Sequence, residues 1–155
     1  MKFGITYPGS TAQDFFEISG EQFAHARLAK RNLFRVLSIE DKFDLVLANY
    51  TDFERELLDL ALYQMVHFGV SWSSGHSDIY KVNRRLANLL SAARLYTDQI
   101  KHDAAALDSS ETSLAQLLSK KFSDQYDARL GYRVMEALRN YAQHRSLPVH
   151  QSELS

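Results

Sequence analysis

The sequence contains no cysteine, which excludes a disulfide framework, a thiolate nucleophile and a cysteine-ligated zinc site. Only two prolines and six glycines occur in 155 residues, and the long stretches between them are rich in helix formers. No hydrophobic run is long enough to cross a bilayer, and the start MKFGITYPGS lacks the apolar core of a signal peptide. We therefore expect an all-α, cytoplasmic protein that does not act at a membrane.

A strong net charge is also absent, because 18 lysines and arginines nearly balance 19 aspartates and glutamates. The whole chain thus offers no global electrostatic reason to bind nucleic acid or an acidic membrane. A hydrophobic content of 45% in a chain of this length favours one core. We expect a single helical domain over residues 1–155, with an irregular extension over 1–37 and a helical bundle over 38–150. A short strand or hairpin is an alternative for part of the extension.

Four helices with short connections are predicted, which favours an antiparallel bundle. The first is expected from Ser38, where SIED fits a capping box, to about Phe68. The polar loop GVSWSSGHS follows, and Ser77 is expected to cap a second helix that ends near Leu107. A shorter third helix covers SLAQLLSKKF, and a fourth covers LGYRVMEALRNYAQH until SLPV stops it.

Charge is distributed unevenly over these predicted helices. The first helix is mainly acidic between Glu40 and Asp59, whereas the second helix and the C-terminal quarter are basic. The basic residues are Lys81, Arg84, Arg85, Arg94, Lys101, Lys120, Lys121, Arg129, Arg133, Arg139 and Arg145. This pattern predicts a polarised surface. It is explained either by ordinary solvated helix faces or by a binding surface for a phosphate polymer.

The last predicted helix has two distinct faces at about 100° per residue. Its expected buried stripe consists of Leu130, Val134, Ala137, Leu138 and Tyr141. The opposite side carries, in angular order, Arg139, Gln143, Glu136, Asn140, Arg133 and His144. Asn140 and His144 form an i,i+4 pair, so we expect them to be neighbours. A histidine in this position can donate or accept a proton near neutral pH.

Arg139, Asn140 and His144 form the pattern R-N-x-x-x-H, which resembles the signature motif of the HEPN superfamily. The resemblance covers roughly residues 40 to 150 and implies a helical bundle with the motif on a late helix. It also implies a metal-independent endoribonuclease that acts as a homodimer, with the two motifs meeting across the two-fold axis. Family members serve as toxins of toxin–antitoxin pairs, as antiviral defence effectors and as RNA-processing nucleases. One toxin branch has a tyrosine two positions after the histidine, where this chain has Ser146.

The expected chemistry is cleavage of RNA by its own 2′-hydroxyl, with no metal and no cofactor. Arg139, Asn140 and His144 are the candidate catalytic residues. His144 would carry the proton and Arg139 would clamp the phosphate, since a planar guanidinium matches phosphate oxygens. Asn140 is expected to orient His144 or to hold the helix end. The candidate supporting or RNA-binding residues are Gln143, Arg133, Arg94 and Arg145.

The expected partners are an RNA substrate, a second copy of the chain and a neutralising antitoxin or regulatory protein. The alternative function is a HEPN-like dimer that binds RNA, a nucleotide or a partner protein without cutting. A purely structural explanation also exists, in which Arg139 pairs with Glu136 and His144 caps its helix. Arg94 lies on a stripe of small and polar residues, Asn83, Ala87, Ser91, Arg94 and Asp98, that can meet the last helix or a partner. An Arg94–Asp98 surface pair is the simpler explanation of that arginine.

Other conspicuous residues give weaker signals. The pair His102-Asp103 lacks the further ligands of a metal phosphohydrolase, so a solvated helix end is the better interpretation. His67 and His76 flank a loop, but no third ligand joins them at a suitable spacing. Trp72 is better explained as a residue that pins its loop to the bundle than as a base-stacking platform.

Overall fold

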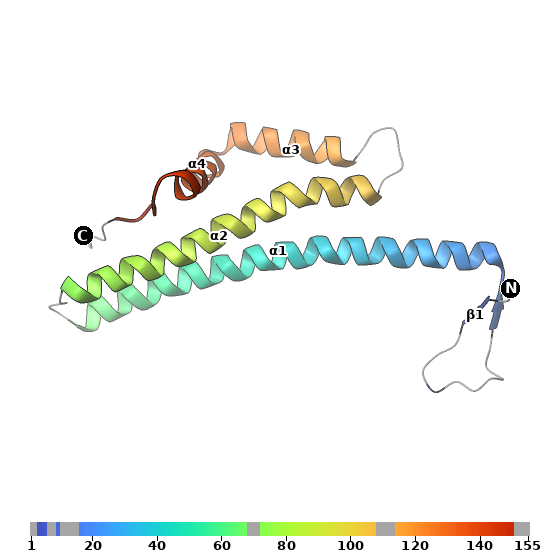
Figure 1. Ribbon diagram of the computed structural model, residues 1–155, viewed down its shortest axis with the longest axis horizontal. Helices are drawn as coiled ribbons and strands as arrows, with labels where there is room; N and C mark the ends of the chain where they lie inside the picture. Colours follow the sequence, from blue (N-terminus) through green and yellow to red (C-terminus); the bar gives the residue numbers. More distant parts are fainter. Residues whose placement is uncertain (1–2, 6–8, 10–15, 68–71, 108–113, 151–155) are drawn as a thin grey trace. The chain divides into compact units, whose positions relative to one another are not determined.

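The computed structural model describes residues 3–5, 9, 16–67, 72–107 and 114–150, and it divides the chain into two compact units, Met1–Ser38 and Ile39–Ser155. These described residues contain four helices: α1 (Gly20–Val66), α2 (Trp72–Leu107), α3 (Leu114–Ala128) and α4 (Leu130–His144) (Figure 1). Two short strands, β1 (Phe3–Ile5) and β2 (Phe16–Ile18), pair antiparallel with Phe3 opposite Ile18. The expected all-α class is confirmed. Within the described residues, no helix combines the length and the apolar character needed to cross a membrane.

The first helix begins at Gly20, so the prediction that it starts at Ser38 was wrong. Its true start is a capping box formed by Ser19 and Gln22. The backbone N–H of Ser19 donates to the side-chain oxygen of Gln22 at 2.8 Å, and the N–H of Gln22 donates to the Ser19 hydroxyl at 3.1 Å. Residues 21–37 contain no proline or glycine and are rich in alanine, leucine, arginine and lysine, so nothing interrupts the helix before Ser38.

The bounds predicted for α2, α3 and α4 agree with the observed bounds to different degrees. The bounds predicted for α4, Leu130 and His144, are confirmed. The predicted end of α2 at Leu107 is confirmed, but α2 begins at Trp72, inside the expected polar loop. The helix α3 continues to Ala128 because the segment after Phe122 contains no proline or glycine. Arg129 separates α3 from α4 with an extended backbone, at φ −118° and ψ 109°.

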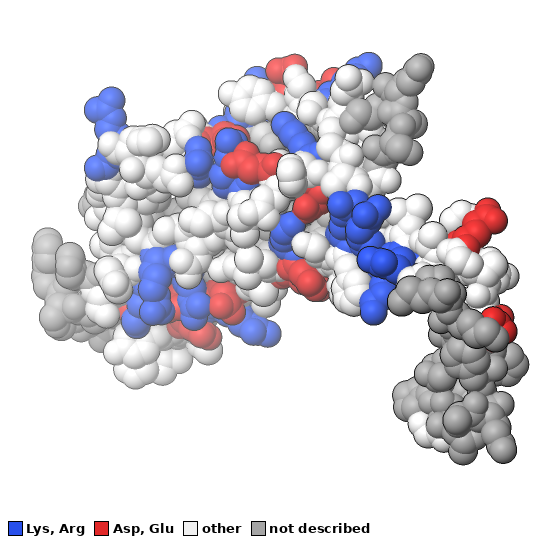
Figure 2. All heavy atoms as spheres, turned by 45° about the vertical axis from the view of Figure 1, so that its right-hand side comes forward, with Lys and Arg blue, Asp and Glu red and all other residues white. Residues whose placement is uncertain are grey.

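In the second unit, the C-terminal part of α1 runs antiparallel to α2, side by side with it (Figure 1). Arg85 lies 2.8 Å from a carboxylate oxygen of Asp52 and 3.2 Å from one of Glu56, while Lys42 pairs with Asp103. The prediction of a polarised surface was therefore wrong, because part of the acidic charge of α1 faces the basic charge of α2. Lys and Arg side chains also mix with Asp and Glu over the face drawn in Figure 2.

The helices α3 and α4 also lie against α2. The ammonium of Lys101 lies 5.4 Å from the ring centre of Phe122 on α3. On α4, Glu136 approaches Arg94 of α2 to 3.8 Å. Past the end of α4, Val149 meets Asn83, so the chain runs antiparallel to α2 in this region.

Most of the expected buried stripe of α4 is exposed in the single chain, and Leu138 is its one partly buried member. Leu130, Val134 and Tyr141 are 68%, 44% and 41% exposed. The side of α4 that is partly buried instead carries Tyr132, Met135, Leu138, Arg139 and Ala142. Periodicity identifies an apolar face but not the neighbour that covers it, and α2 contacts a different side of this helix. The helix α4 thus keeps an exposed apolar strip, defined here as Leu130, Val134 and Tyr141.

Asn83 is the most completely buried polar residue that the structure describes, with 1% exposure. Its side-chain N–H donates to the carbonyl of Val149 at 2.7 Å, and its side-chain oxygen accepts from the N–H of Val149 at 2.9 Å. Both polar groups of the Asn83 amide are satisfied by one backbone position, as burial requires. This pair of bonds ties the segment after α4 to α2.

We predict that Asn83→Ala lowers the free energy of unfolding by about 1–3 kcal/mol, because it leaves buried backbone groups of Val149 without partners. The matched control is Asn88→Ala, since Asn88 is an exposed asparagine of the same helix and its loss should change stability by less than about 0.5 kcal/mol. Urea unfolding followed by circular dichroism, at one protein concentration, measures both values. Equal losses in the two variants would contradict the anchoring role.

Candidate functional site

The three residues of the R-N-x-x-x-H pattern lie in the last two turns of α4. Arg139 is partly buried, whereas Asn140 and His144 are exposed. One terminal nitrogen of the Arg139 guanidinium, Nη1, donates to the side-chain oxygen of Asn140 at 2.9 Å. His144 is the last residue of the helix, and the N–H of Arg145 closes the final turn on the carbonyl of Tyr141 at 2.9 Å.

Asn140 thus has a different neighbour from the one expected. The sequence suggested that it orients His144, but its amide oxygen accepts from Arg139, and the described part of the chain shows no hydrogen bond between Asn140 and His144. The Nε of Arg139 is shielded from solvent and has no hydrogen-bond partner. The guanidinium therefore keeps donors that the protein itself does not use.

Arg94 joins α2 to α4 beside this group. Its Nε lies 2.7 Å from a carboxylate oxygen of Asp98, and its Nη1 lies 3.8 Å from one of Glu136. The Nε–Asp98 contact has ion-pair distance but not hydrogen-bond alignment. The Arg94–Asp98 pair predicted as the simpler explanation is therefore present, and Glu136 faces Arg94. The stripe of α2 that contains Asn83 and Arg94 meets α4 and its C-terminal continuation at those two residues.

The remaining candidate residues are at the surface. Arg133, Gln143 and Arg145 are exposed, on α4 or directly after it. At about 100° per residue, Arg133 lies within about 20° of both Asn140 and His144 around the helix axis. These residues can contact a ligand that lies along the exposed polar face of α4, and they do not contribute to the core.

A cavity of about 430 Å³ lies between the second half of α1, α2 and α4. Its walls are mainly apolar and include Leu47, Leu90 and Met135, with the rings of Tyr50 and Tyr132. Arg139, Arg94 and Glu136 also line it. Arg139 therefore belongs both to the cavity and to the polar face that carries Asn140 and His144.

The pKa of the Tyr132 phenol depends on the charges around this cavity. Burial is the largest cause that raises the pKa of Tyr132 above its ordinary value of 10.0. The carboxylate of Glu136 raises it further, the guanidinium of Arg94 lowers it, and the carboxylate of Asp98 raises it. The sum is an upward shift of the pKa, so the phenol of Tyr132 loses its proton less readily than an ordinary tyrosine does.

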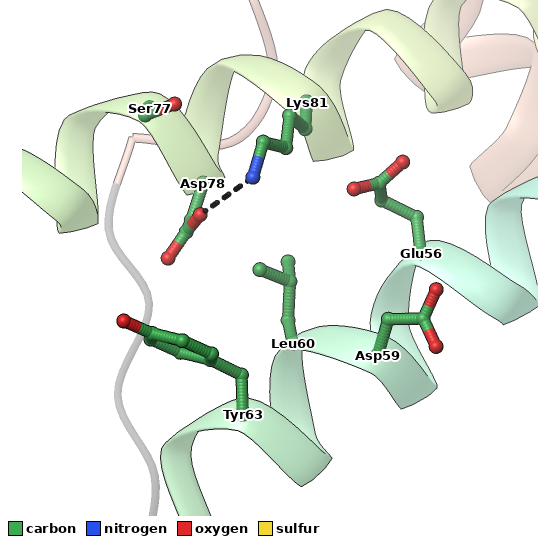
Figure 3. A pocket seen from close by; sticks show the side chains of 7 residues that line it. All are labelled: Glu56, Asp59, Leu60, Tyr63, Ser77, Asp78 and Lys81. Atoms are coloured by element: carbon green, nitrogen blue, oxygen red, sulfur yellow. Dashed lines mark hydrogen bonds and ion pairs between the residues drawn. The ribbon is translucent and has the colours of Figure 1, made fainter. Parts of the chain in front are cut away.

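A second hollow, of about 490 Å³, lies between α1 and the beginning of α2 (Figure 3). It contains Glu56, Asp59 and Asp78, with Tyr63 and Lys81 beside them. The buried carboxylate of Asp78 is paired with Lys81 at 3.2 Å, and Glu56 is paired with Arg85. The Glu56–Arg85 pair joins the two helices, whereas the Asp78–Lys81 pair lies within α2.

The histidines noted in the sequence do not assemble into a metal site. No group of three or more metal-ligating side chains occurs in the part of the chain that the structure describes. Asp103 of the His102-Asp103 pair is bound to Lys42, and the ring of His67 lies 4.3 Å from that of Tyr63. The side chains of Trp72 and His76 lie outside the described residues.

Sequence reasoning missed the roles of Asn83 and of Ser146. The Ser146 hydroxyl donates to the hydroxyl of Tyr141 at 2.9 Å, so this serine helps to hold the chain directly after His144. Asn83 was noticed only as a member of a small-residue stripe, because its partner, Val149, is 66 residues away in the chain. A lone asparagine on the inner side of a predicted helix is the signal that can identify such a residue.

Sequence reasoning also missed a basic segment in α1. Residues 22–39 contain no acidic residue, and they include Arg27, Lys30, Arg31 and Arg35. Arg27 and Lys30 lie over the rings of Phe23 and Phe34, at 5.9 Å and 5.8 Å from the ring centres. This segment forms a cationic surface in the first unit, and the charge run alone was sufficient to find it.

We predict that Glu136→Gln lowers the pKa of Tyr132, since it removes a negative charge that disfavours the tyrosinate. The matched control is Tyr96, whose pKa is raised by burial and by Glu40 and should not change. A pH titration by NMR of protein labelled at the tyrosine ζ carbon measures both, with Tyr132→Phe for assignment. A Tyr132 pKa that stays constant or rises in Glu136→Gln would show that the two side chains are not neighbours in solution.

Comparison of the chain with protein-family models, with curated proteins and with solved structures finds no match. The function proposed below is therefore argued from the motif and from the geometry of the described residues.

Proposed function

We propose that the protein is a HEPN-type endoribonuclease that acts as a homodimer and cleaves RNA without a metal, by attack of the 2′-hydroxyl. One observation carries the proposal: α4 bears Arg139, Asn140 and His144 next to an exposed apolar strip on the same helix. The polar residues supply the chemistry, and the apolar strip supplies a surface on which a second copy can bring its own motif close.

The guanidinium of Arg139 stabilises the phosphate in this mechanism. Attack by the 2′-hydroxyl makes the phosphorus pentacoordinate and increases the negative charge on its oxygens. Arg139 has donors left for those oxygens, because only its Nη1 is engaged by Asn140. The bond to Asn140 restricts the orientation of the guanidinium, so less side-chain entropy is lost when the phosphate binds.

The imidazole of His144 moves the proton. An exposed histidine at the end of α4 can reach a substrate that lies along the polar face, and imidazole is a common general acid and base. In a two-fold dimer, one His144 removes the proton from the 2′-hydroxyl and its symmetry mate protonates the leaving 5′-oxygen. One sequence thereby supplies both an acid and a base.

The exposed apolar strip supports the dimer. Leu130, Val134 and Tyr141 follow one another along α4, adjacent to Arg133 and His144 around the helix axis. Burial of apolar side chains against a second copy stabilises an isologous interface, in which the same strip is used twice. The finer fold assignment, an antiparallel bundle of HEPN type, belongs to this proposal. The antiparallel course of the C-terminal part of α1 along α2 supports it.

A role as a toxin or an antiviral defence effector follows from the resemblance and forms part of the proposal. In that role, an antitoxin or regulatory partner would need to cover His144 or the exposed apolar strip to suppress cutting. Ser146 replaces the tyrosine of one toxin branch and is bonded to Tyr141. We therefore do not propose the tyrosine-dependent regulation of that branch.

We predict that the purified protein cleaves single-stranded RNA in the presence of EDTA, and that Arg139→Ala and His144→Ala each reduce the rate about a hundredfold or more. The matched controls are Arg55→Ala and His102→Ala, which remove the same side-chain types from exposed positions on α1 and α2. Both controls should cut at the wild-type rate, and all four variants should have the wild-type circular dichroism spectrum.

Two further measurements test the nucleophile. A single 2′-deoxy nucleotide at the cut site should leave the strand bound but intact, and normal RNA should acquire a 2′,3′-cyclic phosphate end. Cleavage of the deoxy strand, or activity that needs added metal, would contradict the mechanism. RNA binding without cutting under any of these conditions would favour the alternative function of a non-catalytic binder.

We predict a homodimer at micromolar concentration, and we predict that Val134→Glu converts it to a monomer with loss of cutting, because a charge would then be buried in the interface. Leu117→Glu is the matched control, since Leu117 is an exposed apolar residue of α3, outside the proposed interface. Light scattering measures the mass of each. A wild-type monomer, even with RNA present, would exclude the composite site.

A further inference from the structure

The cavity beside Arg139 has no role in the mechanism described above. On the α4 side, the cavity is lined in part by Gly131, which has no side chain to fill the space. A Cβ atom built on Gly131 would meet no atom within 4 Å, so there is free space at this point of the wall. The volume of about 430 Å³ lies in the range of roughly 300–1,000 Å³ that is typical of small-molecule sites.

We propose that this cavity is a nucleobase subsite, which receives the base next to the phosphate held by Arg139. The inference rests on the proposed function, and it goes further by identifying a part of the protein that selects the cleavage sequence. Arg139 connects the cavity with the polar face of α4. It lines the cavity, whereas Asn140 and His144, the other two motif residues, do not.

The walls of the cavity match the faces of a base. Leu47, Leu90 and Met135 provide apolar contact, and Tyr50 and Tyr132 add aromatic side chains to the lining, with the ring of Tyr132 also edge-on to that of Tyr126 at 6.0 Å. Stacking on aromatic side chains is a common way to hold an unpaired base. The hydroxyl of Tyr132, like any phenol near neutral pH, carries its proton and can donate to a base oxygen or nitrogen.

The polar groups of the cavity match the edge of a base and its phosphate. Glu136 is held only loosely by Arg94, at 3.8 Å, and its carboxylate can accept from an exocyclic amine or a ring N–H. The Nε of Arg139 is shielded from solvent and its Nη1 donates to Asn140, so Nη2 is the donor left for the neighbouring phosphate. A purely aliphatic occupant, such as an apolar side chain of a second copy, would desolvate these charged groups without pairing them, which is costly.

The test is the base profile of cleavage by wild type, Gly131→Leu, Gly131→Ala and Ser123→Leu. Leucine at position 131 extends into the cavity and should reduce kcat/KM at the preferred base about tenfold or more, so that the four bases are cut at similar rates. Gly131→Ala adds only one methyl group and should keep the preference. Ser123→Leu, at an exposed position of α3, should leave the profile unchanged.

An abasic nucleotide gives a test that does not depend on how a variant folds. Placed beside the cut site, it should lower kcat/KM of the wild type by a similar factor and have little further effect on Gly131→Leu, because both changes remove the same contact. A preference that persists in folded Gly131→Leu, or equal effects of the abasic nucleotide on both proteins, would overturn the subsite.

A binding measurement distinguishes a failure of the nucleobase subsite from a failure of the proposed ribonuclease function. The four ribonucleoside monophosphates are titrated into His144→Ala by calorimetry, with and without Gly131→Leu. If the wild type cuts no RNA, binding that Gly131→Leu abolishes still supports the subsite, for a free nucleotide. The absence of both cutting and nucleotide binding overturns it. If Gly131→Leu abolishes both nucleotide binding and dimerisation, the cavity holds part of a second copy of the chain, and the proposed subsite is overturned.

Discussion

Every buried residue that the structure describes lies on α2, and the arrangement of the other helices follows from how they cover this one helix. The apolar core consists of Leu86, Leu89, Leu90, Ala92, Ile100 and Ala104. Each neighbouring helix contacts α2 along one side only, so the sides that face away from α2 stay exposed. The second unit is therefore organised around one central helix. It retains exposed apolar surface, and burial of that surface against a second protein would stabilise the unit further.

This constraint gives α4 its two functional sides. The side that meets α2 carries Tyr132, Met135 and Arg139, and it closes one wall of the cavity. The exposed apolar strip lies on the other side, and the polar face with Asn140 and His144 lies between them. Arg139 is at the boundary where the cavity ends and the polar face begins. A phosphate bound at Arg139 would lie next to the cavity.

Sequence reasoning located what depends on local signals and missed what depends on distant neighbours. The bounds of α4 follow from its 3.6-residue periodicity and from the SLPV stop, and both were found. The start of α1 was missed because SIED was taken as the capping box, whereas Ser19 and Gln22 form it. The partners of Arg85 and Asn83, from 29 to 66 residues away, could not be inferred from one sequence, since periodicity shows which face is apolar but not which helix covers it. The motif residues could be named in advance, but the bond from Arg139 to Asn140 could not.

The two bonds between Asn83 and Val149 extend this arrangement to the C-terminal end of α4. Val149 follows His144 by five residues, so the chain on the far side of the histidine is held to α2, and Ser146 adds a bond back to Tyr141. The C-terminal turn of α4, which would otherwise fray, is thus fixed at both sides. A proton-transfer group is effective only when its position relative to the phosphate is held within a fraction of an ångström. The buried asparagine, remote from the motif in sequence, therefore supports the geometry on which the proposed chemistry at Arg139 and His144 depends.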